Sequence, residues 1–144
     1  MDAKELMIGD WVIFGDEPLK VQHIYNNGYD DVVAEIVEEG TNEYGVYEEI
    51  KDVPSVYCSP IPITPEILEK NGIKKRRDEY AVFGWEGMKQ WYVTLEDFKP
   101  QYDFWFITSS DRDLNISGKI RYVHQLQHAL RLCGLNEIAD NFKV

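Results

Sequence analysis

The sequence has two cysteines, no long apolar run and no excess of basic residues. Cys58 and Cys133 stand far apart, and neither has a second cysteine nearby, which excludes a disulfide framework and a CxxC metal knuckle. No stretch approaches the roughly 20 apolar residues of a membrane-spanning helix, and residues 1–5 lack the basic start of a signal peptide. We therefore expect a cytoplasmic protein that does not bind a membrane.

The common catalytic and nucleotide-binding motifs are missing as well. The sequence contains no Gly-x-Ser-x-Gly nucleophile elbow, no Gly-x-x-x-x-Gly-Lys-Ser/Thr loop and no Gly-x-Gly-x-x-Gly loop. Neither cysteine has a histidine and an acid in an ordered pattern nearby, which would indicate a cysteine nucleophile. These absences favour a protein that is not an enzyme and that holds no cofactor.

The net charge of −11 comes entirely from the first part of the chain. Residues 1–60 contain 14 Asp and Glu but 3 Lys and Arg, whereas residues 61–144 contain 12 of each. An acidic surface repels DNA, RNA and anionic lipid, so we do not expect nucleic-acid binding. The acidic residues either keep the protein soluble or contact a basic protein surface. The carboxylates expected to make that contact include Glu35, Glu38, Glu48 and Glu49.

The apolar content is sufficient for a packed core. The chain of 144 residues is 44% hydrophobic and contains 4 Trp, 9 Tyr and 6 Phe, which excludes intrinsic disorder. Within residues 1–60, Asn27-Gly28 predicts a type I′ hairpin turn, residues 40–42 a second turn, and Ile24 a β-bulge. Short strands joined by tight turns suit a strongly bent sheet, so residues 1–60 predict a small SH3-like β-barrel. Its strands are expected at residues 6–14, 19–25, 31–37, 44–50 and 56–58.

Two helices are predicted in the second part, residues 61–144. Thr64 resembles an N-cap with Pro65 at the first helical position, and Gly72 is expected to end that helix. A longer helix is predicted over residues 119–133, because apolar residues recur there at spacings of three and four until Gly134. The residues of this stripe are Ile120, Val123, Leu126, Leu130 and Cys133.

Between these helices the sequence predicts an antiparallel sheet. Residues 74–77, which are all basic, are interpreted as a solvated loop. Strands are expected at residues 79–85, 88–95, 103–109 and 114–117, and a last helical turn at residues 137–142. The predicted fold class is α+β, with a small SH3-like β-barrel followed by an antiparallel sheet packed by a C-terminal helix. The connector between the two parts is short and apolar, so we expect them to pack together.

Three segments stand in a recognisable order: Leu-Met-Ile-Gly-Asp-Trp-Val at residues 6–12, Ile-Pro-Ile-Thr-Pro-Glu-Ile-Leu at 61–68 and Ile-Arg-Tyr-Val-His-Gln-Leu-Gln at 120–127. Together they resemble a family of small uncharacterised proteins from gut anaerobes and their phages and mobile elements. Asp10 stands where that family usually has Asn, and the residues after Gln127 also depart from its pattern. The resemblance implies no activity and no catalytic residue; it implies an accessory protein of a mobile element.

His124 and His128 form the sharpest chemical motif, because residues one helical turn apart can direct both rings at one metal ion. Zinc proteases have Glu after the first histidine, whereas Gln125 cannot act as a general base. A third ligand would have to come from elsewhere in the chain, with Cys133, Asp140 and His23 as candidates. The alternative is a structural role, since both histidines lie near the edge of the apolar stripe.

Three functions follow from these patterns. The leading hypothesis is a non-enzymatic binding or adaptor protein of phage or mobile-element origin, whose partner is a protein. The second is an acidic, DNA-mimicking inhibitor of a nucleic-acid-binding protein. The third is a metal-dependent enzyme that uses His124 and His128. The sequence carries no signal for the oligomeric state.

Overall fold

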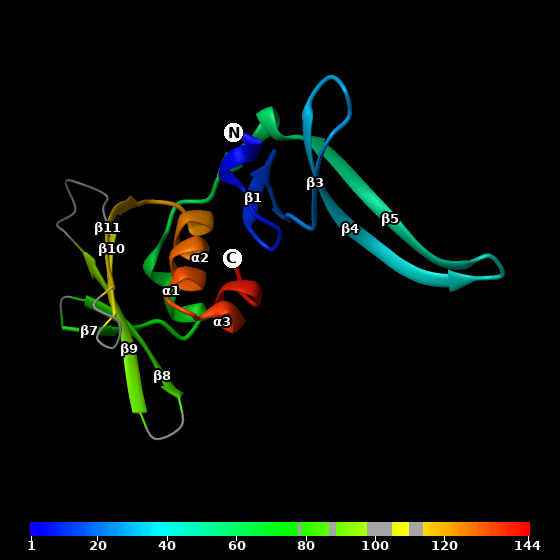
Figure 1. Ribbon diagram of the computed structural model, residues 1–144. Coiled ribbons are helices and arrows are strands. Elements are labelled where there is room, and N and C mark those ends of the chain that lie inside the picture. The colour runs from blue at the N-terminus through cyan, green and yellow to red at the C-terminus, as the bar shows by residue number, and fades with distance from the viewer. Residues whose placement is uncertain (78, 87–88, 98–104, 110–113) are drawn as a thin grey trace. The chain divides into compact units, whose positions relative to one another are not determined.

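The computed structural model describes residues 1–77, 79–86, 89–97, 105–109 and 114–144 (Figure 1). The chain forms two compact units, Met1–Ile61 and Pro62–Val144. The fold is mixed α+β: most of the regular structure is strand, in curled antiparallel sheets, and the α-helices that the structure describes lie in the second unit. The predicted α+β class is confirmed at this level.

The first unit contains two antiparallel sheets. One has the strand order β2-β1-β6 and the other the order β3-β4-β5. Short 3₁₀ turns, η1 (Ala3–Glu5) and η2 (Ser55–Tyr57), precede β1 and β6. The strands are β1 (Trp11–Phe14), β2 (Glu17–Lys20), β3 (His23–Asn26), β4 (Asp31–Asn42), β5 (Gly45–Pro54) and β6 (Cys58–Pro60).

The core of the first unit draws on both sheets. Its buried side chains are Leu6, Val12, Leu19, Val21, Val33, Val53 and Cys58. Phe14 and Ile24 are partly buried and pack against this cluster. Apolar area removed from water is the main favourable term in folding, so this cluster is what holds the two sheets of the unit together.

The predicted strand over residues 19–25, with a bulge at Ile24, is wrong. The chain leaves one sheet after Lys20 and enters the other at His23. Between them, the Val21 N–H donates to the Asp10 carbonyl at 2.8 Å and the Gln22 N–H donates to the Ala34 carbonyl at 2.8 Å. The first bond joins the chain to Asp10, just before β1, and the second joins it to β4 of the other sheet, which is why the alternation of the sequence changes phase here.

The hairpin turns of the first unit also differ from the predictions. The β3–β4 loop spans residues 27–30, and the Asn27 side chain accepts hydrogen bonds from the Tyr29 and Asp30 N–H groups, so the two-residue type I′ turn is wrong. The turn predicted at residues 40–42 is wrong too, because β4 continues to Asn42. The Asn42 side chain accepts from the Tyr44 N–H at 2.8 Å and places the turn at residues 43–44. Residues 56–58 form η2 and the start of β6 rather than one strand.

The second unit contains a five-stranded antiparallel sheet with the order β11-β10-β9-β8-β7. The predicted loop over residues 74–77 is wrong for Lys74–Arg76, which pairs with β8 as an edge strand. Residue 88 and residues 103–104 of the predicted strands lie outside the residues that the structure describes. The strands are β7 (Lys74–Arg76), β8 (Glu79–Glu86), β9 (Lys89–Asp97), β10 (Trp105–Ser109) and β11 (Leu114–Ile120).

Helix α1 (Pro65–Lys70) begins and ends as predicted. The Thr64 hydroxyl accepts a hydrogen bond from the Ile67 N–H at 3.3 Å. After the helix, Gly72 has a φ of 75°, its N–H donates to the Glu69 carbonyl, and the Ile73 N–H donates to the Leu68 carbonyl, both at 3.0 Å. This is a Schellman motif, and its two apolar residues, Leu68 and Ile73, are fully buried.

Helix α2 (Val123–Leu132) starts later than the predicted residue 119. The Ile63 N–H donates to the Arg121 carbonyl, and Pro62 forms a β-bridge with Tyr122, so the chain is extended up to that point. The Gln125 side chain then accepts from the Arg121 and Tyr122 N–H groups and caps the helix. Ile120 of the predicted stripe consequently belongs to β11.

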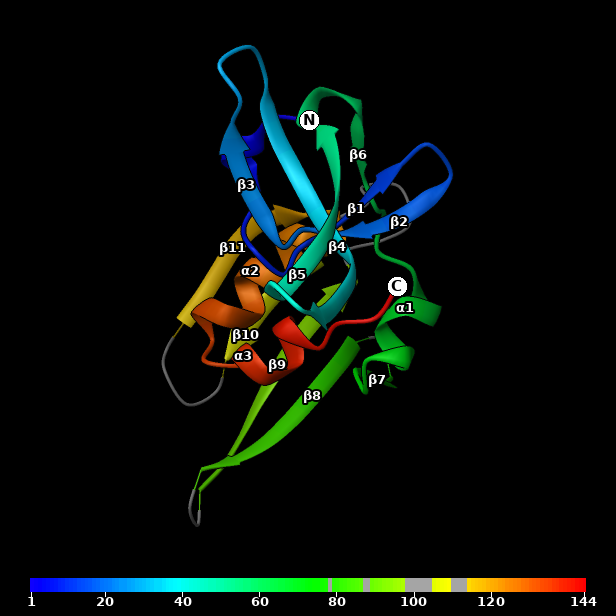
Figure 2. The same cartoon turned by 90° about the vertical axis from the view of Figure 1, so that its right-hand side faces the viewer.

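Helix α3 (Asn136–Asp140) packs beside α2 (Figure 2). The buried Gln127 side chain donates from its amide nitrogen to the Ala139 carbonyl at 2.8 Å. Gly134, with a φ of 81°, ends α2 in a second Schellman motif, which brings together the buried Leu130 and Leu135. Among the described helices, none has the length and apolar character needed to cross a membrane.

The N-cap of α1 gives a first testable result. We expect Thr64→Ala to lower the free energy of unfolding by about 1 kcal/mol, because the cap hydrogen bond to Ile67 is lost. Hydrogen bonds from its own backbone N–H and from the Thr64 side chain lower the pKa of Glu66, so its stabilising contribution is present above the unfolded pKa and is lost as the pH falls through the folded value. The penalty of Thr64→Ala should therefore be larger at neutral pH than in acid. Denaturant unfolding at both pH values measures it.

The matched control is Thr41→Ala, the same change at an exposed strand position. An equal loss of stability in the two variants would contradict the capping role of Thr64.

Candidate protein-binding site

Strands β4 and β5 continue as a two-stranded ribbon beyond the end of β3 (Figure 1). The last pair between β3 and β4 is His23 with Ala34, whereas β4 and β5 stay paired as far as Asn42 with Gly45. We call residues 35–51, which pair with no third strand among the described residues, the arm. Because β3 pairs with β4 only as far as Ala34 and β5 is the last strand of this sheet, both long edges of the arm are strand edges.

The arm exposes apolar side chains over its whole length. Tyr44 at its tip is 90% exposed and Val46 is 79% exposed. Three further large apolar residues of the arm are also exposed: Val37, Tyr47 and Ile50. Val37 is the extra residue of a β-bulge, since the register shifts between Ile36 and Glu38.

Tyr47 and Gly40 form a cross-strand pair in the middle of the arm. A Cβ placed on Gly40 would lie 2.7 Å from the Tyr47 ring, so the ring occupies the space that a side chain at Gly40 would need. The glycine therefore allows the aromatic ring to lie flat across the ribbon. This contact is within the arm and still leaves Tyr47 40% exposed.

The structure brings three of the four predicted partner-binding carboxylates onto the arm beyond its base. In the register of the two strands, Glu38 stands opposite Glu49 and Glu39 opposite Glu48. Glu48 and Glu49 are exposed. Like charges opposite each other destabilise a strand pair, so the Glu39–Glu48 pair costs stability in the isolated ribbon.

Glu35, the fourth predicted carboxylate, has a local structural role. It lies at the base of the arm, half-buried, and its carboxylate accepts a hydrogen bond from the Lys20 N–H at 3.1 Å. The arm's single basic residue, Lys51, contacts the neighbouring strands β1 and β2. Its Nζ lies 3.2 Å from the Glu17 carboxylate and 5.6 Å from the centre of the Phe14 ring. Lys51 therefore does not neutralise the glutamates further along the arm.

Two polar residues of β3 contact side chains of β5. The His23 ring nitrogen Nε2 is 3.9 Å from the Glu48 carboxylate. A hydrogen bond with the Asp52 carboxylate raises the pKa of the Tyr25 hydroxyl.

Sequence reasoning named the glutamates of the arm but missed Val37, Val46 and Ile50 as surface residues. Strand-forming residues on both sides of Gly40 could have indicated the longer hairpin. Residues 40–42 were instead interpreted as its turn.

The two histidines of the metal hypothesis lie on α2. His124 is 2% exposed and its ring stacks on Tyr122, with 5.9 Å between ring centres and 8° between planes. His128 approaches His124 edge-on at 6.0 Å. In the ranges that the structure describes, no group of three or more His, Cys, Asp or Glu side chains could hold a metal ion. The structure thus brings the two histidines together without supplying a described third ligand.

Cys58 is the cysteine that packs in the core of the first unit. It is 4% exposed, and burial raises the pKa of its thiol, against a smaller opposing effect of the N-terminal ammonium group. The thiol is consequently protonated at neutral pH and is a poor nucleophile.

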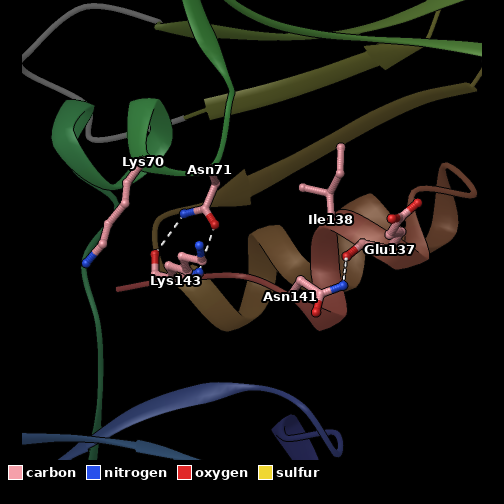
Figure 3. A pocket seen from close by; sticks show the side chains of 6 residues that line it. All are labelled: Lys70, Asn71, Glu137, Ile138, Asn141 and Lys143. Carbon is pink, nitrogen blue, oxygen red and sulfur yellow. Dashed lines mark hydrogen bonds between the residues drawn. The ribbon is translucent and has the colours of Figure 1, made fainter.

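A polar hollow of about 520 Å³ lies between the end of α1 and helix α3 (Figure 3). The Asn71 side chain donates to the Lys143 carbonyl and accepts from the Lys143 N–H, both at 2.7 Å, and so holds the end of the chain across it. These two hydrogen bonds give the Asn71 side chain a structural role. The lining residues are Lys70, Asn71, Glu137, Ile138, Asn141 and Lys143.

Comparisons of the chain with protein-family models, with curated proteins and with solved structures find no match. The candidate site therefore rests on the geometry of the arm alone.

Proposed function

We propose that this chain is a non-enzymatic binding or adaptor protein of phage or mobile-element origin that engages another protein through the arm. The single observation that carries the proposal is the combination of a two-stranded ribbon with exposed Val37, Val46 and Ile50. The SH3-like character of the first unit belongs to the same proposal, since barrels of that type often serve recognition.

The energetics of the ribbon support this function. A two-stranded hairpin is at best marginally stable in water, and it usually needs a third strand or a packed face. The core cluster of the first unit contains no residue of the arm. The apolar side chains of the arm are thus placed where a partner can bury them, at a gain of roughly 25 cal/mol for each Å² removed from water.

A second candidate is the acidic inhibitor that imitates the charge of DNA. The facing glutamates, Glu38 with Glu49 and Glu39 with Glu48, favour it because they concentrate negative charge on a narrow ribbon. It predicts a basic nucleic-acid-binding protein as the partner and binding that weakens strongly with salt. Exposed apolar residues on the same ribbon favour the adaptor, because imitation of DNA charge requires no apolar contact.

Site-specific photo-crosslinking tests the proposal. We expect a benzophenone side chain at Tyr44, on the tip of the arm, to join the full chain to one predominant protein in a lysate of the source organism. The matched control is the same side chain at Tyr57, which is 67% exposed in η2 and lies off the arm. Identical adducts from both positions, or none from Tyr44, would contradict binding through the arm.

A pair of valines provides the quantitative control. Val46→Asp on the arm should reduce the yield of the Tyr44 adduct about tenfold or more, because it places a charge in the apolar contact. Val56→Asp makes the same change at a residue that is 62% exposed but lies in η2, and it should leave the yield unchanged.

A further inference from the structure

The outer edge of β5 is the open edge of a three-stranded sheet, since the strand order is β3-β4-β5. Over Gly45–Pro54 this edge is long, and the five residues from Val46 to Ile50 contain no proline or glycine. Such an edge presents backbone N–H and carbonyl groups that an added strand can bind. Natural proteins shield edges of this kind with charge or cover them with another element.

The side chains along this edge alternate in a defined order. On one face of the ribbon, Glu48 lies between Val46 and Ile50; on the other face, Glu49 follows Tyr47. A strand added to β5 would therefore meet acidic side chains at two consecutive positions, one on each face. Apolar side chains stand on both sides of this acidic pair.

The charge of the arm indicates which kind of strand can bind along the outer edge of β5. The arm contains six acidic residues and one basic residue, Lys51, which is already within 3.2 Å of Glu17. Edge-to-edge pairing with a second copy would bring the glutamates of both arms side by side, and like charges at that distance repel. A cationic strand would instead neutralise them. Charge complementarity thus favours a basic peptide segment over a second copy of this chain.

We infer that the arm binds its partner by adding an extended, basic segment as a further strand along the outer edge of β5. The recognised pattern is two consecutive Lys or Arg residues, opposite Glu48 and Glu49, flanked on each side by β-branched or aromatic residues. This inference rests on the proposed function, and it specifies both the chemistry of the partner and the way in which it docks.

Selection from a displayed library of random eight-residue peptides on the full chain tests the inference. We expect enrichment of two adjacent basic residues flanked by apolar ones. Glu48→Gln combined with Glu49→Gln should weaken the binding of a selected synthetic peptide at least about tenfold in fluorescence anisotropy, by removing two charge-assisted contacts. Glu69→Gln, at an exposed position of α1, is the matched control and should leave the affinity unchanged.

N-methylation of the peptide separates strand addition from attraction by charge alone. Alternate amides of an added strand point toward β5 and away from it. Methylating one alternate set should lower the affinity at least about tenfold, whereas methylating the other set should leave it nearly unchanged.

Equal effects of the two sets would overturn strand addition, although the arm would still bind protein. Enrichment of peptides without the basic pair, or of none, would overturn the proposed partner chemistry. In each of these cases the crosslink at Tyr44 still decides separately whether the arm binds a protein. Binding of two copies of the chain to each other, seen by sedimentation, would also overturn the inference.

Discussion

Removal of the arm is expected to abolish partner binding while leaving the rest of the protein folded. In the variant, residues 37–49 are deleted and Ile36 is joined to Ile50 through Asn-Gly, a two-residue sequence that favours a tight hairpin turn. Ile36 and Ile50 face each other in the register, so the shortened strands can keep their pairing. We expect the affinity for a selected peptide to fall by about 100-fold or more, to the limit of detection.

The stability of this variant should change little. None of the buried residues that hold the two sheets of the first unit together is deleted. Removing the facing pair Glu39 and Glu48 also relieves repulsion in the ribbon. The unfolding midpoint should therefore stay within about 4 °C of that of the full chain, which corresponds to a stability change below roughly 1 kcal/mol.

Thermal unfolding followed by circular dichroism, together with peptide anisotropy, measures both quantities. A loss of structure throughout the first unit would contradict the description of the arm as a separate appendage of that unit. Retained peptide binding would place the binding site elsewhere.

The second large effect concerns α2. Leu130→Ala is expected to lower the free energy of unfolding by about 2–5 kcal/mol, because Leu130 is fully buried and its truncation leaves a cavity. Leu130 also accepts, through its carbonyl, the hydrogen bond from the Leu135 N–H at 2.9 Å that closes the Schellman motif after α2. Its side chain supports the apolar contact that accompanies this motif.

The same helix offers a control of identical chemistry. Leu132 lies two residues further along and is 65% exposed, so Leu132→Ala should change the stability by no more than about 0.5 kcal/mol. Denaturant unfolding monitored at a helix-sensitive wavelength compares the two variants. Equal losses would contradict the burial of Leu130. Leu130→Val, a smaller truncation, should lie between the wild type and Leu130→Ala.

The helix boundaries were the features that local sequence determined best. Thr64, Pro65 and Gly72 set the limits of α1, and Gly134 set the end of α2, because capping depends on hydrogen bonds between residues a few positions apart. Such contacts need no information from the rest of the chain. The acidic character of the first 60 residues was likewise a property of the sequence alone.

Long-range pairing decided the remaining features. The change of sheet at Val21 depends on the Asp10 and Ala34 carbonyls, which are distant in the sequence, and the start of α2 depends on Pro62 and Ile63. The basic residues 74–76 resemble a loop by composition, yet their backbone pairs with β8. Side-chain polarity does not forbid an edge strand, since one edge and often one face of it meet water.

The arm illustrates this division most clearly. The sequence by itself determined its charge and its strand-forming residues, because both are properties of the residues themselves. Only the tertiary structure decided that the pairing of β4 with β3 stops at the His23–Ala34 pair while β4 and β5 continue together, since the length of a strand pair depends on whether a partner strand is present. The exposure of Val46 and Ile50, on which the proposed function depends, is likewise a property of the tertiary structure, because it depends on what packs against the ribbon.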